Sequence, residues 1–171
     1  LAMVEAAEGD HHAAVTECRA LLSRWERSED VHYGVWGLRW SASYLARTGE
    51  AARAEACAEA LARIATDTGH TDALAALAHA IGETALLAGD ADTAADQLRR
   101  ALDLHAGLDM PYERAHIALR AGVALAAAGE RELELERLAD AHRLARGLGA
   151  RPLAREAADE VAALGESLER R

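Results

Sequence analysis

The stretch ALLAGDADTAADQL, residues 85–98, decides the fold of this chain. Gly89-Asp90 stands in it between two apolar runs, and glycine is the residue that most readily takes the left-handed conformation that ends a helix. An acidic residue directly after that glycine is suited to begin the next helix, because its carboxylate can accept from unpaired N–H groups and complement the helix dipole. The stretch therefore predicts the end of one helix followed at once by the start of another.

The same pair recurs with a period of 40 residues. Its four copies are Gly9-Asp10, Gly49-Glu50, Gly89-Asp90 and Gly129-Glu130. Chance is a poor explanation, since only 13 of the 171 residues are glycine. A second set of helix-breaking residues lies midway between the pairs, so each unit is a helical hairpin. We predict a short piece before Gly9 and then helices over residues 10–27, 30–48, 50–67, 71–88, 90–106, 111–128, 130–147 and 152–164.

The composition agrees with an all-α fold. The chain is 51% hydrophobic but only 4% aromatic, and it contains 44 Ala and 24 Leu. Val, Ile and Thr together make up only 16 residues, too few for the pleated surfaces of a β-protein. Small residues also share one repeat position, at Ala42, Gly82 and Gly122, which predicts close approach of helices. We therefore predict one domain over residues 1–171, a right-handed superhelix of stacked antiparallel hairpins of the tetratricopeptide type.

The chain ends predict a segment of a longer protein. Only eight residues precede Gly9, so the chain begins in the middle of a repeat, and a charged tail follows Gly165. The uncharged stretches of the sequence are too short for a membrane helix, and no secretory leader opens the chain. The net charge of −10 disfavours direct contact with nucleic acid. We expect a cytoplasmic protein.

Catalytic and metal-binding patterns are weak. His11 and Cys18, with His12 and Glu8 near them, are the best group for zinc, but a structural zinc site needs four well-placed ligands. Neither cysteine belongs to a CxxC pattern, and the sequence has no GxSxG nucleophile motif. We predict no enzyme activity, no cofactor and no metal.

Two segments are more specific than a helical repeat. Residues 108–115, LDMPYERA, resemble the LGMPYERA phrase of the helical region in large ATP-binding LuxR-family transcriptional regulators, the MalT-like group, although Asp109 replaces the glycine. Because of that replacement we expect the preceding helix to close at Gly107. Residues 148–154, LGARPLA, are similar to the last repeat of the same regulators. No GxxxxGK[ST] loop and no recognisable DNA-reading helix occurs, so the resemblance implies the sensor and coupling region between the ATPase and the helix-turn-helix domain.

Candidate binding residues come from counting back from each turn glycine to the face that tetratricopeptide units turn toward their groove. They are Trp36, Arg39, Trp40, Ser43, His79, Glu83, His116 and Arg120. A polar row on Ala-rich helices suggests a binding surface, but the same row also fits solvated side chains on an unoccupied face.

Five of the six aromatic residues gather in one region, at Trp25, Tyr33, Trp36, Trp40 and Tyr44. The last four follow helical spacing along one stripe. The stripe either fills the core between hairpins, or it presents Trp36 and Trp40 to a peptide or small molecule.

The functional hypothesis is a non-catalytic sensor that binds an effector or a protein and shifts between superhelical curvatures. A stand-alone scaffold for protein interactions is the main alternative. A homodimer is a further hypothesis, because Leu1, Val4 and Trp25 would leave an apolar edge that a second copy could cover.

Overall fold

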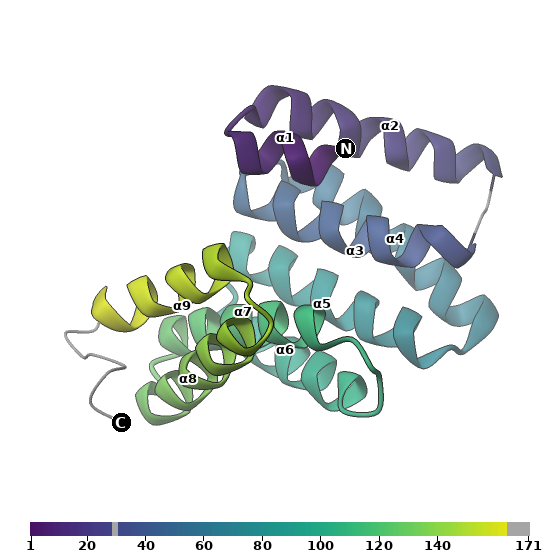
Figure 1. The fold of residues 1–171 in the computed structure, drawn as a ribbon. Coiled ribbons are helices and arrows are strands. Elements are labelled where there is room, and N and C mark those ends of the chain that lie inside the picture. The colour runs from purple at the N-terminus through teal and green to yellow at the C-terminus, as the bar shows by residue number, and fades with distance from the viewer. Residues whose placement is uncertain (29–30, 164–171) are drawn as a thin grey trace.

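The computed structural model describes residues 1–28 and 31–163, and this part of the chain is all-helical, with nine α-helices and no strand (Figure 1). The helices are α1 (Ala2–Glu8), α2 (His11–Ser28), α3 (Val31–Arg47), α4 (Ala51–Thr68), α5 (Thr71–Ala88), α6 (Ala91–His105), α7 (Pro111–Ala127), α8 (Arg131–Gly147) and α9 (Arg151–Ala163). Each described helix end lies within one residue of its predicted position. The predicted ends at residues 30 and 164, and the charged tail, lie outside the described residues.

The helices pack as a stack of hairpins. Each helix packs against the next one in the chain, and α3 also packs on α5, which in turn contacts α7. Consecutive hairpins are thus stacked as predicted: the second helix of one hairpin packs on the first helix of the next, and the first helices of neighbouring hairpins also touch. The stack also curves, and this curvature brings α3 and α9 together: Arg47 on α3 donates to Glu156 on α9, 109 residues later in the sequence, with Nη2 2.5 Å from Oε1. Figure 1 shows α1–α2 and α9 at the two ends of this curved stack.

The Gly-acid pair closes one helix and opens the next. At Gly89 φ is +78°, and the following Asp90 donates its backbone N–H to the carbonyl of Ala85, five residues back, which is a Schellman closure. The Asp90 carboxylate then accepts from the Thr93 N–H at 3.1 Å and caps α6. The other three glycines also have positive φ and the same backbone bond.

The acid at the second position of the pair acts differently when it is glutamate. Asp10 caps α2 by accepting from the Ala13 N–H at 2.9 Å. Glu50 and Glu130 make no side-chain cap bond, and Glu50 forms an ion pair with Arg53 instead. Side-chain capping by the acid is therefore confirmed for the two aspartates, while the two glutamates contribute only a negative charge at the start of the helix.

The turn before α7 differs from the expected closure at Gly107. Helix α6 ends at His105, and the cap residue Ala106 is right-handed. Gly107 does not have positive φ, whereas Gly69 and Gly149 in the corresponding turns do. Without a left-handed glycine, this turn is closed by the bond from the Leu108 N–H to the carbonyl of His105.

Hairpin interiors are packed through small residues. A Cβ on Gly82 would lie 2.6 Å from Cγ of Leu98, and one on Gly122 would lie 2.6 Å from Cδ2 of Leu138. The predicted close approach at these two positions is therefore confirmed: α5 meets α6, and α7 meets α8, at distances that leave no room for a methyl group.

The apolar edge at the start of the chain is smaller than expected. Leu1 and Val4 are exposed, but Trp25 is buried and packs on α3 where Gly34 leaves space for its ring. The inclusion of Trp25 in an exposed edge was wrong, because the glycine lets α3 approach α2 closely enough to cover the indole.

Candidate functional site

The predicted polar row lies on the first helices of three consecutive hairpins. Trp36, Arg39, Trp40 and Ser43 are on α3, His79 and Glu83 on α5, and His116 and Arg120 on α7. Two pairs, Arg39–His79 and Ser43–Glu83, are each separated by one repeat of 40 residues and hydrogen-bond directly. Equivalent positions of adjacent repeats therefore stack on one another in this row.

Glu83 is the centre of the resulting network. Its Oε1 accepts from Ser43 Oγ at 2.8 Å and from Arg120 Nε at 2.8 Å, and its Oε2 accepts from Arg120 Nη2 at 2.9 Å. His79 Nε2 lies 3.2 Å from the same Oε1. Burial by itself raises the pKa of Glu83, but the hydrogen bond from His79 and the charge and bonds of Arg120 outweigh it and hold that pKa well below the usual range.

The network fixes the tautomer of His79. Arg39 Nη1 lies 3.1 Å from His79 Nδ1, and a guanidinium only donates, so Nδ1 accepts and Nε2 carries the proton that is donated to Glu83. Burial lowers the pKa of His79 to about 4, against the opposing effect of its bond to Glu83. The imidazole is therefore neutral at pH 7. It hydrogen-bonds on one side to the Arg39 guanidinium and on the other to the Glu83 carboxylate.

Four of the predicted residues are buried. Arg39, Ser43, His79 and Glu83 are each at most 4% exposed. The interpretation of this row as solvated side chains is therefore wrong for these four, because their polar atoms bond to one another and not to solvent. Burying ionic groups is costly unless every partner is satisfied, so this is a specific arrangement and not a default filling of the core.

Glu113 extends the network but was not among the predicted residues. Trp36 Nε1 donates to its Oε1 at 3.0 Å, and Arg39 Nη2 lies 3.9 Å from the same oxygen. Glu113 precedes His116 by three residues, so it occupies the same face of α7 one turn earlier. Extending the predicted row by one turn would have found it.

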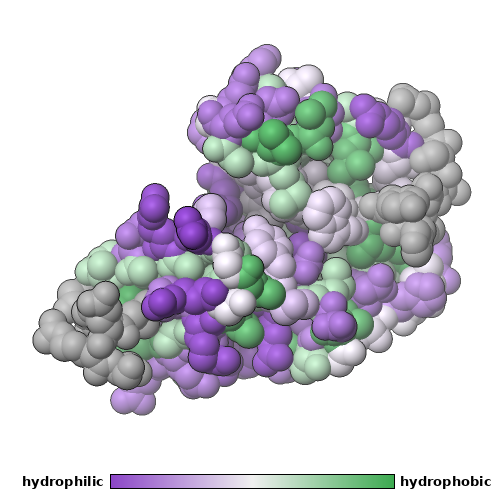
Figure 2. Space-filling view, in the orientation of Figure 1, coloured by the Kyte–Doolittle hydropathy of each residue, from purple (hydrophilic) through white to green (hydrophobic). Residues whose placement is uncertain are grey.

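A cavity of about 390 Å³ opens beside this network, between α1, α3 and α7. It is lined by Ala6, Ala7, His11, Trp40, Ser43, Tyr44, Arg47, Thr48 and His116. Figure 2 shows the surface indented on this face, between the part formed by α1 and α2 and the part formed by α9. Trp40 and Tyr44 stack on each other with ring centroids 5.1 Å apart, and the Tyr44 hydroxyl lies 2.8 Å from His11 Nδ1.

His116 brings an unsatisfied polar atom to the cavity wall. Its Nδ1 is buried, and no group in the described part of the chain hydrogen-bonds to it. The ring lies edge-on to His79, with centroids 5.4 Å apart. Burial, together with the neighbouring His79 and Arg39, holds the pKa of His116 well below its ordinary value, so the ring is neutral. An unpaired buried group of this kind costs about 1–3 kcal/mol.

The aromatic stripe divides between core and surface. Trp36 is 47% exposed, whereas Trp40 and Tyr44 are half-buried against the core cluster of the first hairpins. The side chain of Tyr33 lies outside the described residues. Trp40 thus lines the cavity, while Trp36 lies next to it and is tied by its indole N–H to α7.

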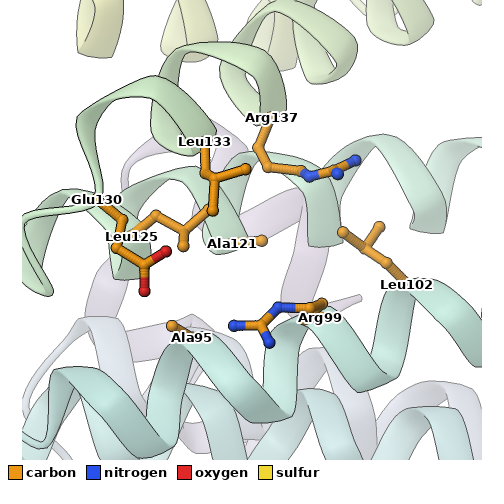
Figure 3. A pocket seen from close by; sticks show the side chains of 8 residues that line it. All are labelled: Ala95, Arg99, Leu102, Ala121, Leu125, Glu130, Leu133 and Arg137. Atoms are coloured by element: carbon orange, nitrogen blue, oxygen red, sulfur yellow. The ribbon is translucent and has the colours of Figure 1, made fainter.

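A second hollow of about 400 Å³ lies between α6, α7 and α8. Figure 3 shows Arg99 from α6 and Arg137 from α8 entering it from facing walls, with Leu102, Leu125 and Leu133 around them. Each arginine is paired with an acidic residue of its own helix, Arg99 with Asp96 and Arg137 with Asp140. No side chain of the polar network lines this hollow.

No protein-family model matches the chain, and no curated protein matches it. Within residues 1–28 and 31–163, no three His, Cys, Asp or Glu side chains come together as a metal-binding group. In the same residues, no helix combines the length and the apolar character needed to cross a membrane.

Proposed function

We propose that this chain is the non-catalytic sensor segment of a LuxR-type transcriptional regulator, and that it binds a small effector in the cavity between α1, α3 and α7. The observation that carries the proposal is the buried, unpaired Nδ1 of His116, a residue that lines that cavity. The volume of about 390 Å³ falls in the range of small-molecule sites. Aromatic walls and a few convergent polar groups are also typical of such sites.

The cavity shares residues with the contacts that hold the stack in its curvature. Ser43 lines the cavity and donates to Glu83 on α5, and Arg47 lines it and donates to Glu156 on α9. A ligand that contacts these side chains therefore acts on bonds that reach two other helices, α5 and α9. This is the physical route by which occupancy of the cavity would change the curvature of the stack.

A ligand must bind one curvature more tightly than the other in order to shift the population. His116 supplies such a difference. Its Nδ1 is buried in the present arrangement, so a ligand reaches it only in an arrangement in which the atoms that cover it have moved. The hydrogen bond formed then stabilises the moved state and not the starting one.

The regulator context rests on the resemblance of residues 108–115 and 148–154 to the LuxR-family helical region. Its test is the complete reading frame that encodes this chain. A phosphate-loop ATPase upstream and a helix-turn-helix domain downstream are expected, and a frame that encodes neither would contradict the regulator role.

A scaffold for protein interactions is the second candidate. It is favoured by the exposed apolar side chains of Trp36, Leu1 and Val4. Trp36 and Leu1 also line one hollow of about 310 Å³ together with Leu21 and Trp40.

The test of effector binding uses the three tryptophan indoles as built-in probes. In ¹⁵N-correlated spectra of the labelled protein, screened against a library of neutral, cationic and anionic small molecules, a cavity ligand is expected to shift the Trp40 indole by contact. It should also shift Trp36, whose indole bonds to Glu113 on α7. Trp25 is buried in the core and serves as the internal control. A library that leaves Trp40 unmoved would contradict effector binding and favour the scaffold.

A further inference from the structure

We infer that the ligand of the cavity between α1, α3 and α7 is a small carboxylate with a flat apolar body. This inference rests on the proposed function, because it names the chemistry of the ligand for the same site. It is argued from the charges, the apolar walls and the hydrogen-bond capacity of the lining residues.

The charge of the lining is the reverse of the charge of the protein. The chain has 29 Asp and Glu residues and a net charge of −10, yet none of the described residues that line the cavity is acidic. Arg47 is the lining residue with a permanent positive charge. A cavity in an acidic protein that excludes carboxylates and admits a guanidinium is complementary to an anion.

Two carboxylates close to the cavity, those of Asp10 and Glu156, are already engaged. Asp10, whose charge acts on the Tyr44 hydroxyl, accepts from the backbone N–H of Ala13 at the start of α2. Glu156 accepts from Arg47. A guanidinium carries five N–H donors, and the bond to Glu156 uses Nη2, so a ligand carboxylate can share Arg47 with Glu156 or replace it. Replacement would release α9 from α3.

The rest of the lining suits a flat, weakly polar body. Trp40 and Tyr44 are stacked with an interplanar angle of 9°, and Ala6 and Ala7 supply small apolar groups from α1. The hydroxyls of Ser43 and Thr48 donate to Glu83 and to the carbonyl of Tyr44, so toward a ligand they offer oxygen lone pairs. These two side chains therefore fit a hydrogen-bond donor on the ligand.

The test compares 4-hydroxyphenylacetate with 4-hydroxyphenylacetamide, which has nearly the same shape and no charge. Affinities are measured from the shift of the Trp40 indole, in the unmodified protein and in Arg47→Met and Arg99→Met variants. Arg99→Met is the matched control, because Arg99 is also an exposed arginine that pairs with an acid and lines a hollow of similar volume. Thermal unfolding of each variant verifies that it is folded.

The expected result is that the acid binds about tenfold or more tightly than the amide. Arg47→Met should abolish this preference, and Arg99→Met should preserve it. Equal binding of acid and amide, no binding of the acid, or a preference that survives Arg47→Met would each overturn the inference. The proposed function is decided separately by the library screen: neutral or cationic ligands that shift Trp40 would support it while overturning the carboxylate, and an empty screen would overturn both.

Discussion

Two rows of largely buried side chains run along the same first helices, and different interactions stabilise each. One is the polar row of Arg39, Ser43, His79, Glu83 and Arg120, which is joined by directional hydrogen bonds. The other is the packing row at repeat position 42, 82 and 122, where α3, α5 and α7 present Ala or Gly to the second helix of each hairpin. Both rows follow the period of 40 residues, so the same repeat positions a row of hydrogen-bonded polar side chains and a row of small residues for close helix packing.

The difference predicts different responses to substitution. In the polar row each group depends on the presence of its partner, because removing one partner leaves another buried and unsatisfied. In the packing row only volume matters, and a change on one helix can be offset by an opposite change on the facing helix. The predictions below test this contrast, beginning with the largest expected effect.

Glu83→Ala is expected to lower the free energy of unfolding by about 3–5 kcal/mol, because it leaves the part-buried Arg120 guanidinium and the buried His79 without their acceptor. Chemical denaturation followed by circular dichroism measures the change. Glu136→Ala is the control, since Glu136 is an exposed glutamate, and it should change stability by less than about 0.5 kcal/mol. Similar losses for the two variants would mean that the network contributes nothing specific.

Gly82→Ala is expected to destabilise the protein by about 1–3 kcal/mol, because the new methyl group would lie 2.6 Å from Leu98 Cγ. Adding Leu98→Ala should restore part of this loss, since the double variant reproduces the Ala42 and Ala58 combination of the preceding hairpin. The comparison of single and double variants by chemical denaturation measures the coupling. If Leu98→Ala costs as much in the Gly82→Ala background as alone, the two positions do not share space as described.

Acid is expected to weaken the polar row before the packing row. The pKa of His79 is about 4 in the folded protein and near 6.5 when unfolded, so between these values the unfolded chain binds more protons. Stability is therefore lost as pH falls from about 6.5 toward 4, by up to about 1.4 kcal/mol per pH unit from this histidine. Denaturation at a series of pH values measures the slope. His79→Gln should remove the contribution of this histidine, one bound proton, from the dependence of stability on pH. His12→Gln, at an exposed position, should leave that dependence unchanged.

The Arg47–Glu156 contact should contribute least to stability. Both side chains are about one third exposed, and such pairs are worth about 0.2–1 kcal/mol. A double-mutant cycle of Arg47→Met and Glu156→Gln, measured at low and high salt, isolates this energy. A coupling above about 2 kcal/mol would contradict the assignment of this pair as an exposed, screened contact.

Much of the fold could be predicted from the sequence because its signals are local. The glycine-acid pairs set the helix ends by backbone geometry, and the alternation of small and large apolar residues sets the hairpin packing. The turn after α6 could not be predicted in the same way, since His105 rather than Gly107 ends that helix and the closure depends on which carbonyls are in reach.

The polar row was identified by its repeat position, but its burial was not. Sequence spacing places Ser43 and Glu83 on corresponding faces, yet whether water or a neighbouring repeat covers them depends on how strongly the stack curves. The same holds for Arg47 and Glu156, which are 109 residues apart and meet only because of that curvature. The orphaned Nδ1 of His116 likewise has no signature in the sequence.

The most direct test of the account is the distance between the two ends of the stack with and without a cavity ligand. Spin labels on Arg19→Cys in α2 and Asp159→Cys in α9 report this distance by pulsed electron paramagnetic resonance. Cys18 and Cys57 are buried, and burial raises the pKa of both thiols, so they should remain unlabelled. The account predicts that a saturating ligand that shifts Trp40 also moves the distance distribution to a new maximum. An unchanged distribution at saturation would contradict the coupling between the cavity and the curvature of the stack.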